Sequence, residues 1–188
     1  MKATGIVRRI DDLGRVVIPK EIRRNLRIRE GDPLEIYVDE EGEVILKKYS
    51  SIAELGVFAQ EYADSLHQAT LHTTFITDRD TVVAVSGKGV SHRDYLERPV
   101  SSVVEKAMES RKSAILSRAG TGEAGNPCSV IEDDMNSYTM QVLAPIVAGG
   151  DPIGCVTMVS SESDAHMGDM ELKLAETAAG FLSRQMEQ

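Results

Sequence analysis

The stretch RRIDDLGRVVIPKEIRRNLRIREGD, residues 8–32, decides how the first part of the chain folds. It contains the β-branched run RVVI at 15–18, and a second run, TGIVRRI at 4–10, overlaps its start. The turn-forming sequence DDLG separates the two runs. This pattern predicts two short strands joined by a tight turn.

A short helix is predicted to follow these strands. Pro19 fixes its own φ at a value that suits the first turn of a helix, and KEIRRNL continues from it. Ile22 and Leu26 are one turn apart and therefore share an apolar face. The arginines of the segment lie away from that face: Arg23, Arg24 and Arg27.

Two more strands complete a first domain, predicted at 1–50. The runs LEIYV and EVILKKY flank a turn at EEG, and GDP at 31–33 breaks the chain before them. The domain is therefore expected to be rich in β-structure, with one short helix. So small a unit buries little apolar surface, and a two-turn helix is not stable without tertiary contacts. We therefore expect domain 1–50 to be stabilised by forming a homodimer.

Positive charge is concentrated in this domain although the chain is acidic. The formal net charge of the chain is -9, yet residues 1–29 hold nine basic residues against three acids. Such segregation keeps a protein soluble while it presents one electrostatic face to a polyanion. The stretch 30–43, with seven acids and no basic residue, is expected to form the opposite face. Charged residues on exposed strands are often only a solvated surface, and this alternative stays open here.

Arginine favours nucleic acid over the solvated-surface alternative. Its planar fork of donors suits bidentate contact with phosphate oxygens or with guanine O6 and N7, which lysine cannot match. The segment has few acids, its arginines alternate with apolar residues, and two copies would merge in a dimer. We therefore expect double-stranded DNA as the partner, with contacts to phosphates and to some base edges.

The segment 51–70 predicts an amphipathic helix that links the two domains. Its apolar residues recur at steps of three and four, as in a coiled-coil seam. One possibility is a helix packed on its own domain, and the other is a contact between subunits. The residues of the seam are Ile52, Leu55, Ala59, Tyr62, Leu66 and Ala69.

The remainder, 71–188, predicts an α+β domain with a mostly antiparallel sheet. Strands are indicated at TTFITD, TVVAVSG, SAILS, YTMQVLAPIV and PIGCVTMVS, with glycines 149 and 150 at the last turn. The segment SSVVEKAMES reads as a helix opened by serine caps. A C-terminal helix from about Asp169 carries one apolar side, made of Leu172, Ala175, Ala179, Leu182 and Met186.

Nothing in the sequence indicates catalysis, a metal or a cofactor. GTGEAG at 120–125 has dinucleotide-site spacing, but Asn126 and Pro127 prevent a helix from opening there. The four histidines are scattered, and the chain has no GxSxG, HExxH or P-loop. Two cysteines, Cys128 and Cys155, are too few for a disulfide framework. With no apolar run long enough for a membrane span and no signal peptide, we expect a cytoplasmic protein without a membrane partner.

The sequence of 4–49 closely resembles the AbrB-type swapped-hairpin DNA-binding domain of bacterial transition-state regulators, above all in GRVVIPKEIRRNL and DPLEIYVD. The resemblance implies that two chains interleave their hairpins into one dimeric barrel. It also implies DNA contacts by four arginines, Arg8, Arg15, Arg23 and Arg24. Three further residues are expected as helpers: Lys2, Arg9 and Lys20.

The second half is similar to a GAF domain, through its leading helix, TTFITD, TVVAVSG and VLAPIVAGGDPIGCVTMVS. GAF domains often bind small molecules, so a small-molecule ligand of unknown identity is expected without any residue set that defines it. Both halves together resemble regulators of sporulation genes in endospore-forming bacteria. The resemblance implies an activator or repressor, associated with the nucleoid of the forespore. From the seam of 51–70 we expect a tetramer joined through the linking helix and the GAF-like domain, with a dimer as the open alternative.

Two rival functions belong to other classes. Swapped-hairpin domains also serve as antitoxins, although an ordered C-terminal domain differs from a short toxin-binding tail. A GAF-type sulfoxide reductase using Cys128 and Cys155 is the other rival, although more cysteines are expected in that role.

Overall fold

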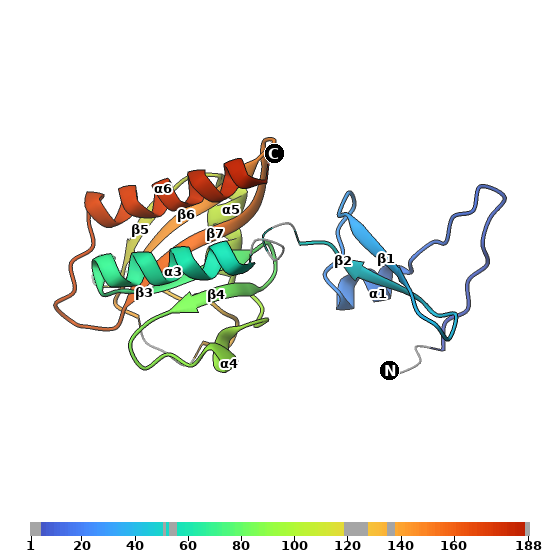
Figure 1. The fold of residues 1–188 in the computed structure, drawn as a ribbon, viewed down its shortest axis with the longest axis horizontal. Helices are drawn as coiled ribbons and strands as arrows, with labels where there is room; N and C mark the ends of the chain where they lie inside the picture. The colour runs from blue at the N-terminus through green and yellow to red at the C-terminus, as the bar shows by residue number, and fades with distance from the viewer. Residues whose placement is uncertain (1–4, 51, 53–55, 119–127, 135–137, 187–188) are drawn as a thin grey trace. The chain divides into compact units, whose positions relative to one another are not determined.

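The computed structural model describes residues 5–50, 52, 56–118, 128–134 and 138–186. The chain divides into two compact units, Met1–Tyr49 and Ser50–Gln188 (Figure 1). We call them the N-terminal unit and the C-terminal unit and describe each by itself. The finer division into 1–50, 51–70 and 71–188 stays a prediction.

The N-terminal unit contains a helix and a hairpin that the sequence predicted. Helix α1 spans Lys20–Asn25, and strands β1 (Leu34–Val38) and β2 (Val44–Lys48) pair in antiparallel fashion. In this hairpin Val38 lies opposite Val44 beside the turn. The predicted helix and the second pair of strands are therefore confirmed.

The first predicted pair of strands is not formed within one chain. Residues 5–10 and 15–18 have no regular strand structure (Figure 1). They extend from either side of the turn at 11–15, and we call them the first and the second arm. Their apolar side chains are exposed: 88% of Val7 and 70% of Val17 are accessible. Pairing the arms with each other would bury neither of their faces and would therefore gain little stability, which agrees with their lack of strand structure in one chain.

The C-terminal unit is built on a five-stranded sheet with the order β4-β3-β7-β6-β5, and all neighbouring strands are antiparallel. The antiparallel α+β prediction is thus confirmed. The strands are β3 (Thr73–Asp78), β4 (Val82–Ser86), β5 (Ala114–Ser117), β6 (Met140–Ala148) and β7 (Asp151–Ser160).

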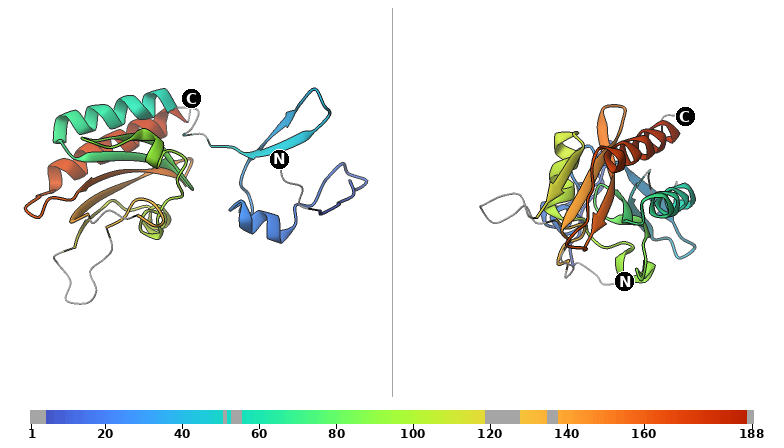
Figure 2. Two further views of the ribbon diagram at one scale, coloured as in Figure 1. Left: turned by 90° about the horizontal axis from the view of Figure 1, so that it is seen from below. Right: turned by 90° about the vertical axis from the view of Figure 1, so that its left-hand side faces the viewer.

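Helices cover both faces of this sheet (Figure 2). Helices α3 (Gly56–Thr70) and α6 (Asp169–Gln185) lie on one face, and α5 (Ser102–Ser110) lies on the other. The predicted serine cap of α5 is present, since Ser101 Oγ accepts a hydrogen bond from Val104 N at 3.4 Å. The short helix α4 (His92–Tyr95) was not predicted.

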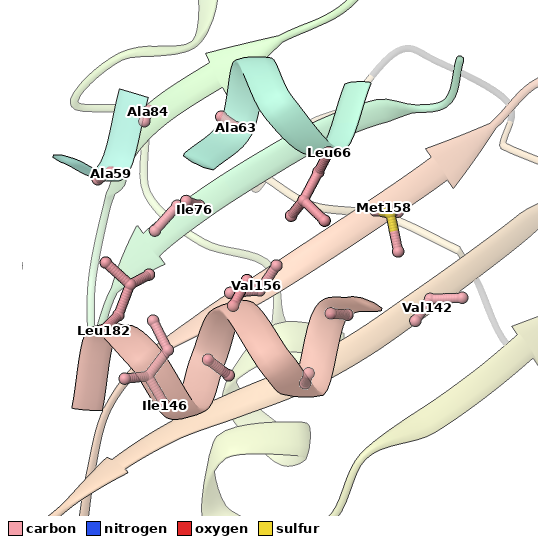
Figure 3. Close-up of a cluster of buried hydrophobic side chains, with 14 of the residues drawn as sticks. Ala59, Ala63, Leu66, Ile76, Ala84, Val142, Ile146, Val156, Met158 and Leu182 are labelled. Carbon is pink, nitrogen blue, oxygen red and sulfur yellow. The ribbon is translucent and has the colours of Figure 1, made fainter. Parts of the chain in front are cut away.

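Alternation along the strands divides the core between the two faces. Ile76 and Val156 point toward α3 and α6 (Figure 3), whereas Phe75 and Cys155 belong to clusters on the opposite face. Residues i and i+1 of a strand project to opposite sides, so the sheet is covered with apolar side chains on both.

The predicted seam of 51–70 packs mainly on its own unit. Ala59 and Leu66 are buried in the core shared with α6, and the ring of Tyr62 lies 4.8 Å from that of Phe181. Ala69 is exposed, and Leu55 lies outside the described residues. Of the two possibilities left open by the sequence, the structure therefore supports packing within the domain for these side chains.

One glycine explains the PIG sequence at the start of β7. A Cβ on Gly154 would lie 2.2 Å from the carbonyl oxygen of Thr77 on β3, closer than two such atoms approach. Because residue 154 is a glycine, β3 and β7 can stay paired as far as the pair formed by Asp78 and Gly154.

Candidate nucleic-acid interface

The predicted DNA-contacting residues occupy three elements of the N-terminal unit. Arg8 and Arg9 lie on the first arm, Arg15 closes the turn, and the others belong to α1. All the described members are exposed except Arg23, which is half-buried. Lys2 lies outside the described residues. The remaining members on α1 are Lys20 and Arg24.

A single carboxylate organises the turn at 11–15. Asp11 Oδ1 accepts hydrogen bonds from the backbone N–H of Leu13 at 3.0 Å and of Arg15 at 2.8 Å. Its other oxygen accepts from Arg15 Nε at 2.8 Å, which is also an ion pair. Gly14 donates to the Asp11 carbonyl and has φ 76°, a value that glycine adopts without strain.

These bonds set the charge of the turn. The backbone N–H of Arg15, followed by its guanidinium, holds the pKa of Asp11 below its ordinary value. Hydrogen bonds to a charged carboxylate favour the ionised form. Asp11 is therefore an anion fixed beside Arg15.

The turn of the second hairpin repeats this geometry, but its last residue is acidic instead of an arginine. Asp39 Oδ1 accepts from the N–H of Glu41 at 3.1 Å and of Glu43 at 2.8 Å, and Gly42 has φ 82°. The pattern D-x-x-G-x thus forms the same turn at 11–15 and at 39–43. Arg15 stands where Glu43 stands in the second copy, so the two turns differ in what they can attract.

Helix α1 presents its two arginines differently. Arg24 is exposed, whereas Arg23 is half-buried and its Nε atom is shielded from solvent without a hydrogen-bond partner among the described residues. The sequence predicted that both arginines lie away from the apolar face of the helix. The exposure of Arg24 agrees with this prediction, and the half-burial of Arg23 agrees with it less well. The apolar face itself is weaker than predicted, because Leu26 is 59% exposed and only Ile22 is partly covered.

A buried ion pair fixes the segment that follows α1. Lys48 Nζ lies 3.0 Å from Asp32 Oδ2 and donates to the carbonyl of Arg27 at 3.0 Å. The same carboxylate oxygen accepts from the N–H of Arg29 at 2.8 Å. Only 2% of the Asp32 side chain is accessible, so it is not part of an exposed acidic face. This pair joins the end of β2 to the basic segment.

Sequence reasoning missed the roles of Asp11 and Asp32. The repeated D-x-x-G-x pattern was a signal that could have identified Asp11 as the organiser of a turn. No local pattern pairs Asp32 with Lys48, because they lie on separate elements.

The described residues of the C-terminal unit show no comparable concentration of exposed cations on one element, and both cysteines are buried. Burial raises the pKa of the Cys155 thiol to about 12 and also raises the pKa of Cys128. GTGEAG at 120–125 lies outside the described residues. Within the described part of the chain, no group of histidine, cysteine or acidic residues could hold a metal ion.

In the described part of the chain, no helix is both long enough and apolar enough to cross a bilayer.

An N-terminal unit that opens with a basic segment is followed by an antiparallel sheet covered by helices, which is the architecture of an AbrB-like domain followed by a GAF-like domain. The family model described as "Stage V sporulation protein T C-terminal, transcription factor" matches residues 54–187. The chain belongs to the stage V sporulation protein T family of transcription factors.

Individual relatives agree with this assignment. The chain is 60% identical to stage V sporulation protein T of Bacillus subtilis (strain 168) over 188 residues, which is 100% of both chains. It is 55% identical to the transition state regulatory protein AbrB of the same organism over 69 residues, 37% of this chain and 71% of AbrB.

Two further comparisons concern single units. The family model "Antidote-toxin recognition MazE, bacterial antitoxin" matches residues 7–54. The solved GAF domain region of a putative membrane protein from Geobacter sulfurreducens matches with a TM-score of 0.52 and 17% identity, covering 73% of this chain and 95% of that one. This second likeness shows the fold of the C-terminal unit alone and confirms its GAF-like architecture.

Proposed function

We propose that the chain regulates sporulation genes by binding double-stranded DNA through the basic face of its N-terminal unit. The carrying observation is the set of exposed cations on the first arm, the 11–15 turn and α1, in a chain whose net charge is -9. Phosphate contacts from such a face supply affinity and position the protein, and base contacts add selectivity. Arg8, Arg24 and Arg15 are the principal contacts, with Arg9, Lys20, Lys2 and the half-buried Arg23 contributing less.

The binding unit is a homodimer in this proposal. Apolar side chains of the hairpin are exposed on one face, with 65% of Ile36, 72% of Val38 and 67% of Val44 accessible. The apolar residues of the arms are exposed as well. A second copy of the same unit would cover both sets and give the arms strand partners, which supports a swapped hairpin. Covering such area is the main driving force for association.

Further assembly would use a different surface. Because the seam of 51–70 is largely packed inside its own unit, a tetramer through α3 would use the exposed face that carries Val57 and Phe58. The proposed regulatory input is a small molecule or protein that binds one arrangement of the GAF-like units better than another. We place the protein in the cytoplasm, on the nucleoid of the forespore.

The antitoxin function is a second candidate because of the match to the MazE model at 7–54. Its test is co-purification of a stoichiometric small toxin with the full chain. The C-terminal unit favours regulation over the antitoxin function, because it is a compact domain and not a short toxin-binding tail.

An enzyme using the cysteines is disfavoured by their burial. A thiolate is the reactive form, and the pKa of about 12 keeps Cys155 protonated at neutral pH. We infer that neither cysteine acts as a nucleophile.

The test is a titration of full-length protein onto duplex DNA at several salt concentrations. The logarithm of the affinity should fall linearly with the logarithm of salt concentration, by about 0.9 for each phosphate contact. Arg24→Ala should flatten this slope by about 0.9 per chain, while Lys112→Ala, which removes an exposed cation from the C-terminal unit, should not. An affinity independent of salt, or an Arg24→Ala slope equal to that of the wild type, would overturn the proposal.

A further inference from the structure

Arg15 differs from the other cations of the proposed interface. Among the described residues of this interface, it alone has a carboxylate partner, with Arg15 Nε 2.8 Å from Asp11 Oδ2. Arg8 and Arg24 are exposed and make no such pair within the described part of the chain. The local charge at Arg15 is therefore compensated, whereas theirs is not.

The compensation does not depend on the ion pair alone. An exposed pair of this kind contributes little stability by itself. Here, however, the backbone N–H groups of Leu13 and Arg15 hold Asp11 Oδ1 at 3.0 and 2.8 Å. The carboxylate would stay beside Arg15 even if the guanidinium moved.

A fixed anion changes which ligand Arg15 can bind well. A phosphate that approaches Arg15 also approaches the Asp11 carboxylate, and the two like charges repel. The edge of a guanine carries no net charge and offers O6 and N7 as acceptors. Asp11 engages Nε, whereas the two terminal nitrogens of the guanidinium have no partner among the described residues and can make a bidentate contact of this kind.

We propose that Asp11 is a positioning residue that makes Arg15 a reader of guanine edges, while Arg8 and Arg24 contact phosphates. The inference rests on the proposed DNA-binding function of this face. It assigns base readout to one arginine that the sequence could not distinguish from its neighbours.

The second hairpin supplies a matched control. Asp39 closes the same turn through the same pair of backbone hydrogen bonds, but no arginine occupies the fifth position. Asn retains a side-chain oxygen that can accept both backbone bonds, so Asp11→Asn and Asp39→Asn each remove one charge and leave the turn acceptors in place. Only Asp11→Asn should change DNA recognition.

The experiment uses full-length protein and three probes. The first is the duplex that the wild type enriches most from a random-sequence pool. The second is the same duplex with 7-deazaguanine, which lacks the N7 acceptor, and the third is poly(dA-dT), which has no guanine. Each is titrated at several salt concentrations.

In the wild type, 7-deazaguanine should weaken binding by about fivefold or more, the loss expected when a bidentate base contact is broken. This penalty should fall below about twofold in Asp11→Asn and in Arg15→Lys, which keeps the charge but lacks the fork. Asp11→Asn should also bind poly(dA-dT) more tightly, with a salt slope steeper by up to about 0.9 per chain, because its Arg15 is free to contact phosphate. Asp39→Asn should match the wild type on every probe.

Several results would overturn the inference. The first is that the duplex enriched by the wild type contains no guanine. The second is that 7-deazaguanine does not weaken binding by the wild type. Neither result depends on how any variant folds. Another is Asp11→Asn that is folded by circular dichroism and behaves like Asp39→Asn. In these cases salt-dependent binding by the wild type would leave the proposed function standing. A wild type that binds none of the probes would overturn the proposed function itself.

Discussion

The contact between Gly154 and β3 predicts a large effect from adding one methyl group. In Gly154→Ala the new Cβ would lie 2.2 Å from the Thr77 carbonyl oxygen unless β3 and β7 separate by about 1 Å. Overpacking of this kind costs about 1–3 kcal/mol, and each ladder hydrogen bond lost adds about 1 kcal/mol. We expect the free energy of unfolding to fall by about 3 kcal/mol.

For a unit of this size, 1 kcal/mol corresponds to about 3 °C in the midpoint of thermal unfolding, so the midpoint should fall by about 10 °C. Differential scanning calorimetry of the full chain measures it. Gly180→Ala is the matched control, because Gly180 lies within α6 and a Cβ there meets no atom within 4 Å. Alanine favours a helix interior over glycine by about 0.5–1 kcal/mol, so this variant should be slightly stabilised. If Gly154→Ala unfolds no earlier than Gly180→Ala, the argument from close approach is wrong.

Three further outcomes follow from buried or hydrogen-bonded groups. Cys155, with a pKa of about 12, should resist iodoacetamide at pH 8 in the native protein and react after denaturation in urea, as peptide mass analysis would show; rapid labelling of the native state would contradict its burial. Burial raises the pKa of Glu171, but hydrogen bonds, above all from Gly168 N at 2.7 Å, outweigh it and lower the pKa below the ordinary 4.5. The stability that this carboxylate contributes should be complete above pH 4.5 and should be lost as the pH falls through the lower pKa of the folded state. Glu171→Gln should therefore be less stable than the wild type by about 1 kcal/mol at pH 7 and equally stable in strong acid. Urea titrations at the two pH values would measure this difference. Lys48→Met removes the ammonium group that lies 3.0 Å from the buried Asp32 carboxylate and should destabilise the N-terminal unit by about 3 kcal/mol, seen as a lower urea midpoint for loss of DNA binding. An unchanged midpoint would mean that the pair is dispensable.

The C-terminal unit was largely predictable because its signals are local. Alternation along TTFITD and PIGCVTMVS indicated buried strands, and a serine before α5 indicated its start. The pairing of β3 with β7 was not predictable in this way, because strands far apart in the sequence give no local sign of which neighbour they choose. Nor did any pattern announce Gly154 as the point of closest approach.

The candidate interface was predictable in composition but not in detail. Charge counting identified the basic segment, yet it treated Arg15, Arg23 and Arg24 as equivalent. Their differences arise from contacts that composition does not contain, since a carboxylate holds Arg15 and packing half-buries Arg23. The strand prediction for the two arms was wrong for one chain because their apolar side chains find no partner within it.

In the proposed function, DNA binds to the arms, the first turn and α1 of the N-terminal unit. The most direct test is a titration of isotopically labelled full-length protein with duplex DNA, followed by amide and arginine side-chain NMR signals. We predict shifts at Arg8, Arg15 and Arg24 and none at the 39–43 turn, although both turns share one backbone geometry. Shifts centred on the 39–43 turn or on the sheet of the C-terminal unit, with Arg8 and Arg24 unaffected, would contradict the account.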